Sequence, residues 1–233
     1  MEYVVPYIVV ALCAYLMGSF STSYVIGRIK KVDLKKMATR NLGASNATVV
    51  RGWKFGLLVA VVDIAKGIGA VLLTRFFAPD LPAIAYVAGT CVTLGHIFPF
   101  YLKFRGGKGF ATFIGAVAGL CFPFAVVLAV CIISLALITN YIVVGTFITV
   151  LAAPLFFYFM YGEWRGALVL SIASAVIIWK HRENIVHIKD GTEGKVRNLF
   201  GKGHRKKAEE AIKELDKLRE AEEAAKKSAE ENK

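Results

Sequence analysis

Long uncharged apolar runs, separated by short polar stretches, make up most of this chain. The runs near residues 4–27, 55–77 and 82–100 each approach or exceed the roughly 20 apolar residues that cross a bilayer as an α-helix. They predict an all-α, polytopic integral membrane protein. The first run has no basic residues ahead of it and is too long for the apolar core of a signal peptide. We therefore interpret it as the first membrane helix.

The cations of the membrane part gather between the apolar runs. Eight lie between Arg28 and Lys54, a second group comprises Lys103, Arg105 and Lys108, and a third begins at Lys180. Because positive loops favour the cytoplasmic side, we expect all three groups in the cytoplasm and the N-terminus outside. The predicted location is a membrane that the chain crosses several times.

Three breaks interrupt the apolar pattern between residues 109 and 179. They fall at Phe122-Pro123, at Thr139-Asn140 and at Tyr161-Gly162-Glu163, and they divide this stretch into four pieces. The sequence thus predicts seven membrane helices, with five as the alternative. Six is excluded by parity, because both ends of the stretch lie on the cytoplasmic side. Some pieces are shorter than about 20 residues, so we expect local thinning or partly buried ends.

Composition agrees with this class. Apolar residues make up 56% of the chain, mean hydropathy is +0.56, and the net charge is +12. The four cysteines lie inside apolar runs without metal-ligand spacing, so we expect neither a metal site nor a cofactor. The excess of positive charge is a topological signal rather than a nucleic-acid surface, and no obligate protein partner is inferred.

The stretch from Gly95 to Gly109 is the richest in candidate chemistry. Glycines let backbone N–H groups converge on an anion, and flanking cations add charge. It is not a Walker loop, because Leu102 and Gly109 stand where that motif needs glycine and Ser or Thr. The alternative is an ordinary basic loop beside the membrane. The candidate phosphate-binding residues are His96, Lys103, Arg105, Gly106, Gly107, Lys108 and Gly109.

A second polar segment follows the first membrane helix. It is rich in hydroxyl and amide side chains, and a helix beginning near Asn46 would aim its free N–H groups at the same anion. The alternative is a turn rich in helix-capping residues. Candidate binding residues here are Thr39, Asn41, Gly43, Ala44, Ser45 and Asn46, with Arg51 as a nearby counter-charge.

Two further polar groups lie in or beside apolar runs. Asp63 and Lys66 are three residues apart and share one helical face, so they either support a site or form a self-neutralising pair that reaches toward water. His181 and Asn184 are one turn apart, and Glu193 follows. A histidine here suits a general base or a cationic phosphate ligand; the alternative is an interfacial anchor.

In this order, the motifs resemble those of the bacterial acyl-phosphate:glycerol-3-phosphate acyltransferases, the PlsY family. The resemblance rests on Gly18–Arg28, Asn41–Asn46, Asp63–Gly67, Gly95–Gly109, His181–Ile185 and Gly191–Glu193. It implies a bacterial inner membrane as the location. It also implies a seven-helix enzyme, with its motifs on the cytoplasmic side, that makes lysophosphatidic acid from acyl phosphate and glycerol 3-phosphate. The chain departs from the family pattern at residues 38–40, and at Val49 and His187, where arginine is common.

Both substrates of such a reaction carry a phosphate with about 1.5 to 2 negative charges. The available counter-charges are Lys108, Lys103, Arg105, Lys66 and Arg51. No histidine is followed five residues later by aspartate, the motif of acyltransferases that use acyl-CoA or acyl-carrier protein. The base is then His181 or a substrate phosphate oxygen, with a slight preference for the phosphate.

A transporter or channel for phosphorylated anions is the competing function. It would share the basic glycine-rich loops, but the polar groups are predicted on one side only and repeated halves are not detectable.

The chain ends in a segment of different character. Ten cations and nine anions alternate between Lys202 and Lys233, around a narrow apolar stripe of Ile212, Leu215 and Leu218. We expect residues 201–233 to form a charged, mobile cytoplasmic helical tail, beside a membrane acyltransferase domain over residues 1–200.

Overall fold

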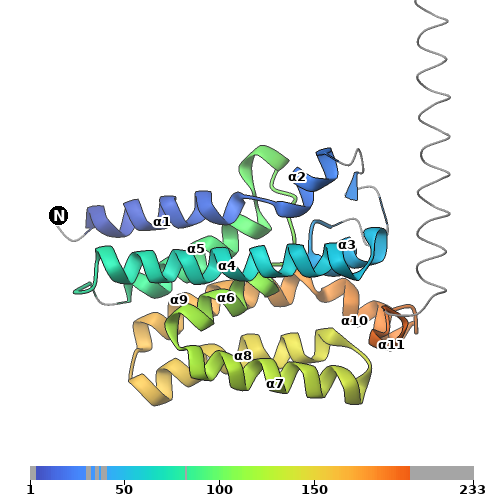
Figure 1. Cartoon of the computed structure of the whole chain (residues 1–233). Helices are drawn as coiled ribbons and strands as arrows, with labels where there is room; N and C mark the ends of the chain where they lie inside the picture. Colours follow the sequence, from blue (N-terminus) through green and yellow to red (C-terminus); the bar gives the residue numbers. More distant parts are fainter. Residues whose placement is uncertain (1–3, 30–32, 35–36, 38–40, 82, 200–233) are drawn as a thin grey trace, which may run out of the picture.

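The computed structural model describes residues 4–29, 33–34, 37, 41–81 and 83–199, and the regular structure of these residues is helical (Figure 1). This confirms the all-α prediction for the described part; residues 201–233 lie outside it. The helices are α1 (Val4–Ser19), α2 (Thr22–Ile29), α3 (Ala44–Arg51), α4 (Trp53–Phe77), α5 (Ile84–Ile97), the 3-10 turn η2 (Phe100–Leu102), α6 (Phe110–Leu120), α7 (Phe122–Thr139), α8 (Ile142–Tyr161), α9 (Trp164–Lys180), α10 (Arg182–Lys189) and α11 (Val196–Leu199).

The three breaks expected after residue 109 are confirmed. Pro123 occupies the first turn of α7, where its missing N–H costs no hydrogen bond. Asn140 ends α7 and Gly162 ends α8, both in the left-handed conformation with φ of 66° and 64°. These breaks separate α6, α7, α8 and α9.

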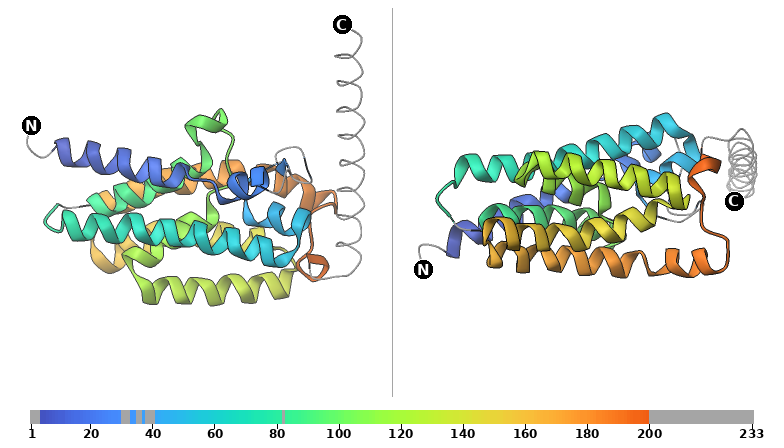
Figure 2. Two further views of the ribbon diagram at one scale, coloured as in Figure 1. Left: turned by 45° about the horizontal axis from the view of Figure 1, so that its top comes forward. Right: turned by 90° about the horizontal axis from the view of Figure 1, so that it is seen from below.

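Among the described residues, helices α1 and α4 to α9 lie side by side, and successive ones run in opposite directions (Figures 1 and 2). Within the bundle α1 packs on α5, α4 on α6, and α8 on both α7 and α9. The short helices α3 and α10 lie at the end of the bundle opposite the N-terminus (Figure 1).

In the part of the chain that the structure describes, five segments have the length and composition of membrane spans: Val4–Ile29, Trp53–Phe77, Ile84–Leu102, Phe122–Thr139 and Ile142–Tyr161. The other two bundle helices, α6 and α9, are shorter, with 11 and 17 residues. The count of seven crossings therefore stays a prediction. The first span is not the continuous helix that the apolar pattern suggests, because it is interrupted between Ser19 and Thr22.

Glycines bring α4 and α6 into close contact. A Cβ on Gly67 would lie 2.2 Å from the carbonyl oxygen of Thr112, and one on Gly115 would lie 2.1 Å from that of Ile64. Small residues let membrane helices approach this closely. The contact fixes the position of α6, and of the loop before it, against the middle of α4.

The far end of the short helix α6 is stabilised by a side chain. Arg75 on α4 donates from Nη1 to the carbonyl oxygens of Gly119 and Leu120, at 3.1 and 3.2 Å. The last carbonyl groups of a helix have no hydrogen-bond donors within the helix, and the Arg75 guanidinium supplies donors for two of them. Arg75 therefore lets α6 end after 11 residues.

Candidate active site

A cavity of about 370 Å³ opens where several helices begin, at the end of the bundle that carries α3 and α10. The segments that line it come from α3, α4, α5, α6, α8, α10 and residues 192–194. The predicted site residues that line it are Asn41, Gly43, Ala44, Ser45, Asp63, His96, Lys108, Gly109, His181, Asn184 and Glu193. Three polar groups far apart in sequence thus converge on one cavity.

Two helix N-termini face this cavity. Gly43 precedes α3 and Gly109 precedes α6, and neither helix has a side-chain cap. The first N–H groups of a helix lack intrahelical partners and favour an anion. Gly109 has a φ of 90°, a conformation that side-chain-bearing residues rarely adopt. The glycine is needed there to turn the chain from Lys108 into α6.

Lys108 lies at one end of a polar chain that joins two of the predicted groups. Its ammonium donates to Oδ1 of Asn184, whose Nδ2 donates to Oε1 of Glu193 at 2.7 Å. Burial lowers the pKa of Lys108, while the charges of Glu193 and Glu183 oppose that shift. Asn184 therefore places the ammonium and also separates it from the Glu193 carboxylate.

His181 ends α9 and is buried at the cavity wall. Its Nδ1 lies 2.8 Å from the carbonyl oxygen of Ile177, which can only accept, so Nδ1 carries the proton and Nε2 a lone pair. Burial lowers the pKa of His181 to about 4, helped by the nearby Lys108 charge and opposed by the bond to Ile177. At neutral pH a ring with this pKa is a weak base, and its role as a phosphate ligand stays a prediction.

The segment after α10 holds Glu193 in place through His187. The backbone N–H groups of Thr192 and Glu193 donate to the carbonyl oxygen of His187, at 2.8 and 3.0 Å. The His187 ring contacts the Thr192 hydroxyl at 3.1 Å, and both residues line the cavity. The sequence analysis left His187 out, although its position three residues after Asn184 puts the two on one face of α10.

Asn140 braces the same segment from α7. Its carbonyl oxygen accepts from the backbone N–H of Val196 at 2.9 Å, and its Oδ1 accepts from that of Arg197 at 3.0 Å. The sequence marked Asn140 only as a helix break, because partners 56 and 57 residues away leave no local signal.

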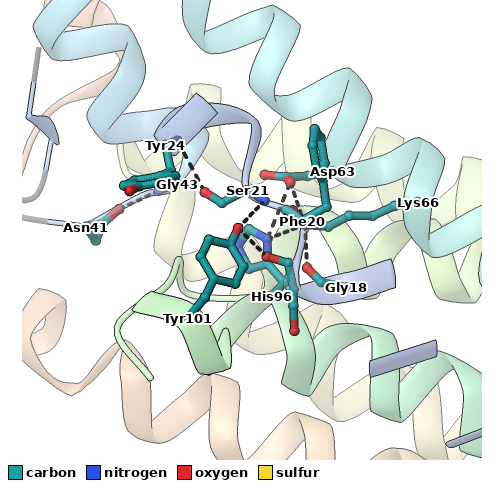
Figure 3. A network of polar contacts seen from close by, with 11 residues as sticks. Gly18, Phe20, Ser21, Tyr24, Asn41, Gly43, Asp63, Lys66, His96 and Tyr101 are labelled. Carbon is teal, nitrogen blue, oxygen red and sulfur yellow. Dashed lines mark hydrogen bonds and ion pairs between the residues drawn. The ribbon is translucent and has the colours of Figure 1, made fainter. Parts of the chain in front are cut away.

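The first polar segment is anchored by Asn46, which is fully buried and does not line the cavity. Its Nδ2 donates to the carbonyl oxygens of Leu34 and Asn41, at 2.9 and 2.6 Å. Oδ1 of Asn41 in turn accepts from the N–H of Gly43 at 2.9 Å (Figure 3). Asn46 thus supports the segment, and the helix expected to begin near Asn46 is confirmed, since α3 begins at Ala44. Thr39 lies outside the described residues.

The other predicted cations do not line the cavity. Arg51, Lys103 and Arg105 are exposed, and Lys66 is buried beside Asp63, with 2.9 Å between Nζ and Oδ1. The alternative in which this pair reaches toward water is therefore wrong. Gly106 and Gly107 also lie outside the lining, and a role for these six residues in substrate binding stays a prediction.

Part of the cavity wall is apolar, and its residues were not among the predicted site residues. Apolar residues within apolar helices give no sign that they border a cavity. The additional residues in this apolar wall are Val49, Phe110, Ala111, Ile142 and Val143, and Thr146 also lines the cavity. The site therefore combines anion-binding groups with apolar side chains.

Comparison with known proteins decides the family. Residues 8–191 match the family model described as "Glycerol-3-phosphate acyltransferase". This chain belongs to the glycerol-3-phosphate acyltransferase family. It is therefore an acyltransferase of lipid biosynthesis, and its apolar helices agree with an integral membrane enzyme.

Curated relatives carry the same name. The glycerol-3-phosphate acyltransferase of Clostridioides difficile (strain 630) is 34% identical over 195 residues, which covers 82% of this chain and 95% of the relative. That of Coxiella burnetii (strain CbuG_Q212) is 35% identical over 192 residues, covering 82% and 98%.

Solved structures agree with the fold. The crystal structure of PlsY, an integral membrane glycerol 3-phosphate acyltransferase, in its glycerol 3-phosphate form matches with a TM-score of 0.77 and 29% identity. The match covers 84% of this chain and 99% of that one. The lysophosphatidic acid form matches with a TM-score of 0.73 over 81% of this chain and 94% of that one.

Proposed function

We propose that this acyltransferase moves a fatty acyl group from acyl phosphate to a hydroxyl of glycerol 3-phosphate, giving lysophosphatidic acid and inorganic phosphate. The observation that carries the proposal is a cavity whose lining combines Lys108 and two uncapped helix N-termini with several apolar side chains. Two phosphates and one acyl chain are the groups that this arrangement suits. The names of the PlsY structures, which mention glycerol 3-phosphate and lysophosphatidic acid, support the acceptor and the product.

The two phosphates have separate places in this proposal. The phosphate of glycerol 3-phosphate binds Lys108 and the N-terminus of α6, where a compact ammonium and backbone N–H groups meet. The phosphate of the acyl donor binds the N-terminus of α3, at Gly43, Ala44 and Ser45. The acyl chain then extends along the apolar wall beside Phe110 and Val143.

The acceptor hydroxyl oxygen attacks the carbonyl carbon of the mixed anhydride, and the bond from that carbon to the phosphate oxygen breaks. The hydroxyl proton passes to a phosphate oxygen, so the products are the ester and hydrogen phosphate. A phosphate with a second pKa near 6 is the better base, because the pKa of His181 lies at about 4. Lys108 and the helix N-termini stabilise the charge that develops on the reacting oxygens.

The membrane orientation is part of the proposal. The cavity end of the bundle faces the cytoplasm and the N-terminus lies outside, in a bacterial inner membrane. The N-terminus and α3 at opposite ends of the bundle support this orientation, as do the basic residues near α3 and α10 (Figure 1).

The acyl donor is tested directly by offering three donors in parallel with glycerol 3-phosphate. We expect turnover with acyl phosphate and none with acyl-CoA or acyl-carrier protein. The measurement is lysophosphatidic acid formed by purified enzyme in detergent, together with the phosphate released. Phosphate release must depend on glycerol 3-phosphate. Equal turnover with acyl-CoA would refute the proposed donor, and phosphate release without acceptor would refute the transfer reaction.

The base is tested by replacing His181 with Gln, which keeps an uncharged polar side chain. If phosphate takes the proton, His181→Gln keeps kcat within about tenfold of wild type and mainly raises KM, since removing a general base costs about 10²–10⁴ in rate. The profile of kcat between pH 5.5 and 8 should then have the same shape in both enzymes. A loss of kcat beyond a hundredfold in a folded His181→Gln enzyme would assign the base to the histidine.

A further inference from the structure

Lys66 is a buried cation whose bonds all lie within the protein. Its Nζ donates to the carbonyl oxygens of Gly18 and Phe20, at 3.0 and 2.9 Å, and lies 2.9 Å from Oδ1 of Asp63 and 2.8 Å from Nδ1 of His96 (Figure 3). An ammonium has three hydrogens, so these four neighbours use all of them. Lys66 also does not line the cavity. It has no hydrogen left to offer a substrate.

Two of these bonds hold the interruption between α1 and α2. A break in a membrane helix leaves carbonyl groups that need partners inside the protein. Lys66 supplies partners for Gly18 and Phe20, while the Tyr101 hydroxyl donates to the carbonyl oxygen of Ser19 at 2.9 Å and accepts from the N–H of Ser21 at 3.2 Å. The break is therefore stabilised by hydrogen bonds from Lys66 on α4 and from Tyr101 on η2 (Figure 3).

The other two neighbours, Asp63 and His96, connect Lys66 to residues 103–109, the loop before α6 that carries Lys108 (hereafter the reaction loop). His96 lies 3.3 Å from Asp63 through the same Nδ1 that contacts Lys66. The opposite edge of its ring packs on Gly107, where an added Cβ would lie 2.1 Å from Nε2. The N–H of Gly107 also donates to the carbonyl oxygen of His96 at 3.2 Å. The residue after Gly107 is Lys108.

We propose that Lys66 is a positioning residue for the glycerol 3-phosphate subsite: with Asp63 it fixes the His96 ring, and the ring fixes Gly107 and so the place of the Lys108 ammonium. This inference rests on the proposed function of Lys108. It gives Lys66 a part in the reaction without contact to either substrate. The proposed acyl-donor subsite at α3 is not among the contacts of Lys66. We therefore expect Lys66 to affect mainly the binding of glycerol 3-phosphate.

The test is Lys66→Met, which keeps the length of the side chain but removes its charge and hydrogens. The matched control is Lys54→Met, at an exposed lysine near the start of the same helix. We expect Lys66→Met to raise KM for glycerol 3-phosphate by about tenfold or more, since a displacement near 1 Å can cost about a hundredfold. KM for acyl phosphate should change less than about threefold, and Lys54→Met should resemble wild type. A folded Lys66→Met enzyme in which both KM values match wild type would overturn the proposal, as would an equal rise in both.

Two further measurements keep the outcome decisive. If Lys66→Met does not fold, Lys66→Arg keeps the charge with a bulkier head, and we expect it to fold with an intermediate rise in KM for glycerol 3-phosphate. Wild-type KM values for both substrates in folded Lys66→Arg would then overturn the proposal. Thermal stabilisation of the detergent-purified enzyme by glycerol 3-phosphate alone reports acceptor binding without any donor. If glycerol 3-phosphate stabilises the wild-type enzyme but the enzyme does not use acyl phosphate, the proposed donor is wrong. The Lys66 inference is then still tested, because it expects glycerol 3-phosphate to stabilise Lys66→Met less than wild type.

Discussion

Replacing Lys108 with Ala is expected to raise KM for glycerol 3-phosphate by about 10- to 100-fold, because a hydrogen bond to a charged group contributes roughly 1.5–3 kcal/mol. The ammonium is the buried cation that reaches the cavity beside the N-terminus of α6. KM for acyl phosphate should change less, because its phosphate is assigned to α3. Lys108→Arg should restore only part of the affinity, since a guanidinium is too broad for a loop closed by Gly107 and Gly109. The measurement is initial rates over a matrix of both substrate concentrations.

A suitable control is Lys189→Ala, at an exposed lysine in the last turn of α10 that is absent from the cavity lining. It removes the same charge from the same end of the molecule and should leave both KM values near wild type. If Lys108→Ala had the kinetics of wild type, the phosphate assignment for this loop would be abandoned, and with it the placement of both substrates.

Asn184→Leu should lower kcat/KM by about 5- to 100-fold, because removing one partner from a partly buried, charge-linked contact costs roughly 1–3 kcal/mol. The Asn184 amide holds the Lys108 ammonium on one side and the Glu193 carboxylate on the other. Leucine has a similar size and neither donates nor accepts. Without the amide, Lys108 and Glu193 are free to pair directly, which withdraws the cation from the phosphate.

Glu193→Gln is the informative comparison for Asn184→Leu. An amide oxygen of glutamine can still accept from Nδ2 of Asn184, so the polar chain keeps its connection while the negative charge disappears. We expect a smaller loss than for Asn184→Leu. Wild-type kcat/KM in a folded Asn184→Leu enzyme would show that Lys108 needs no partner on α10.

The helix breaks could be predicted because their cause is local. Proline at the start of α7, asparagine after it and glycine after α8 each impose a backbone conformation that any reader of the sequence can recognise. The interruption between α1 and α2 could not be predicted in the same way. Its carbonyl groups are satisfied by Lys66 and Tyr101, which lie more than 40 residues further along the chain.

The polar half of the site was also predictable, because charged and amide side chains beside apolar runs stand out. Lys108, His181 and Asn184 line the cavity as expected. The positioning role proposed for Lys66 was not predictable from composition. A lysine in a protein with a phosphate-binding type of loop is interpreted as a counter-charge for phosphate until its hydrogen bonds are known. For the apolar wall, Ile142 and Val143 differ in no local way from the lipid-facing residues of the same helix.

The spacing of Asp63 and Lys66 has a consequence for how this protein is made. A lone charge in the bilayer interior is costly, and the carbonyls of α1 and the ring of His96 can lower that cost only once the bundle has assembled. With the carboxylate three residues before the ammonium, the two charges neutralise each other within α4 itself. That helix can thus enter the membrane as an electrically neutral segment before it meets its neighbours. The pair then acquires its outside partners during helix association, so the reaction loop is completed by the last stage of assembly rather than by insertion.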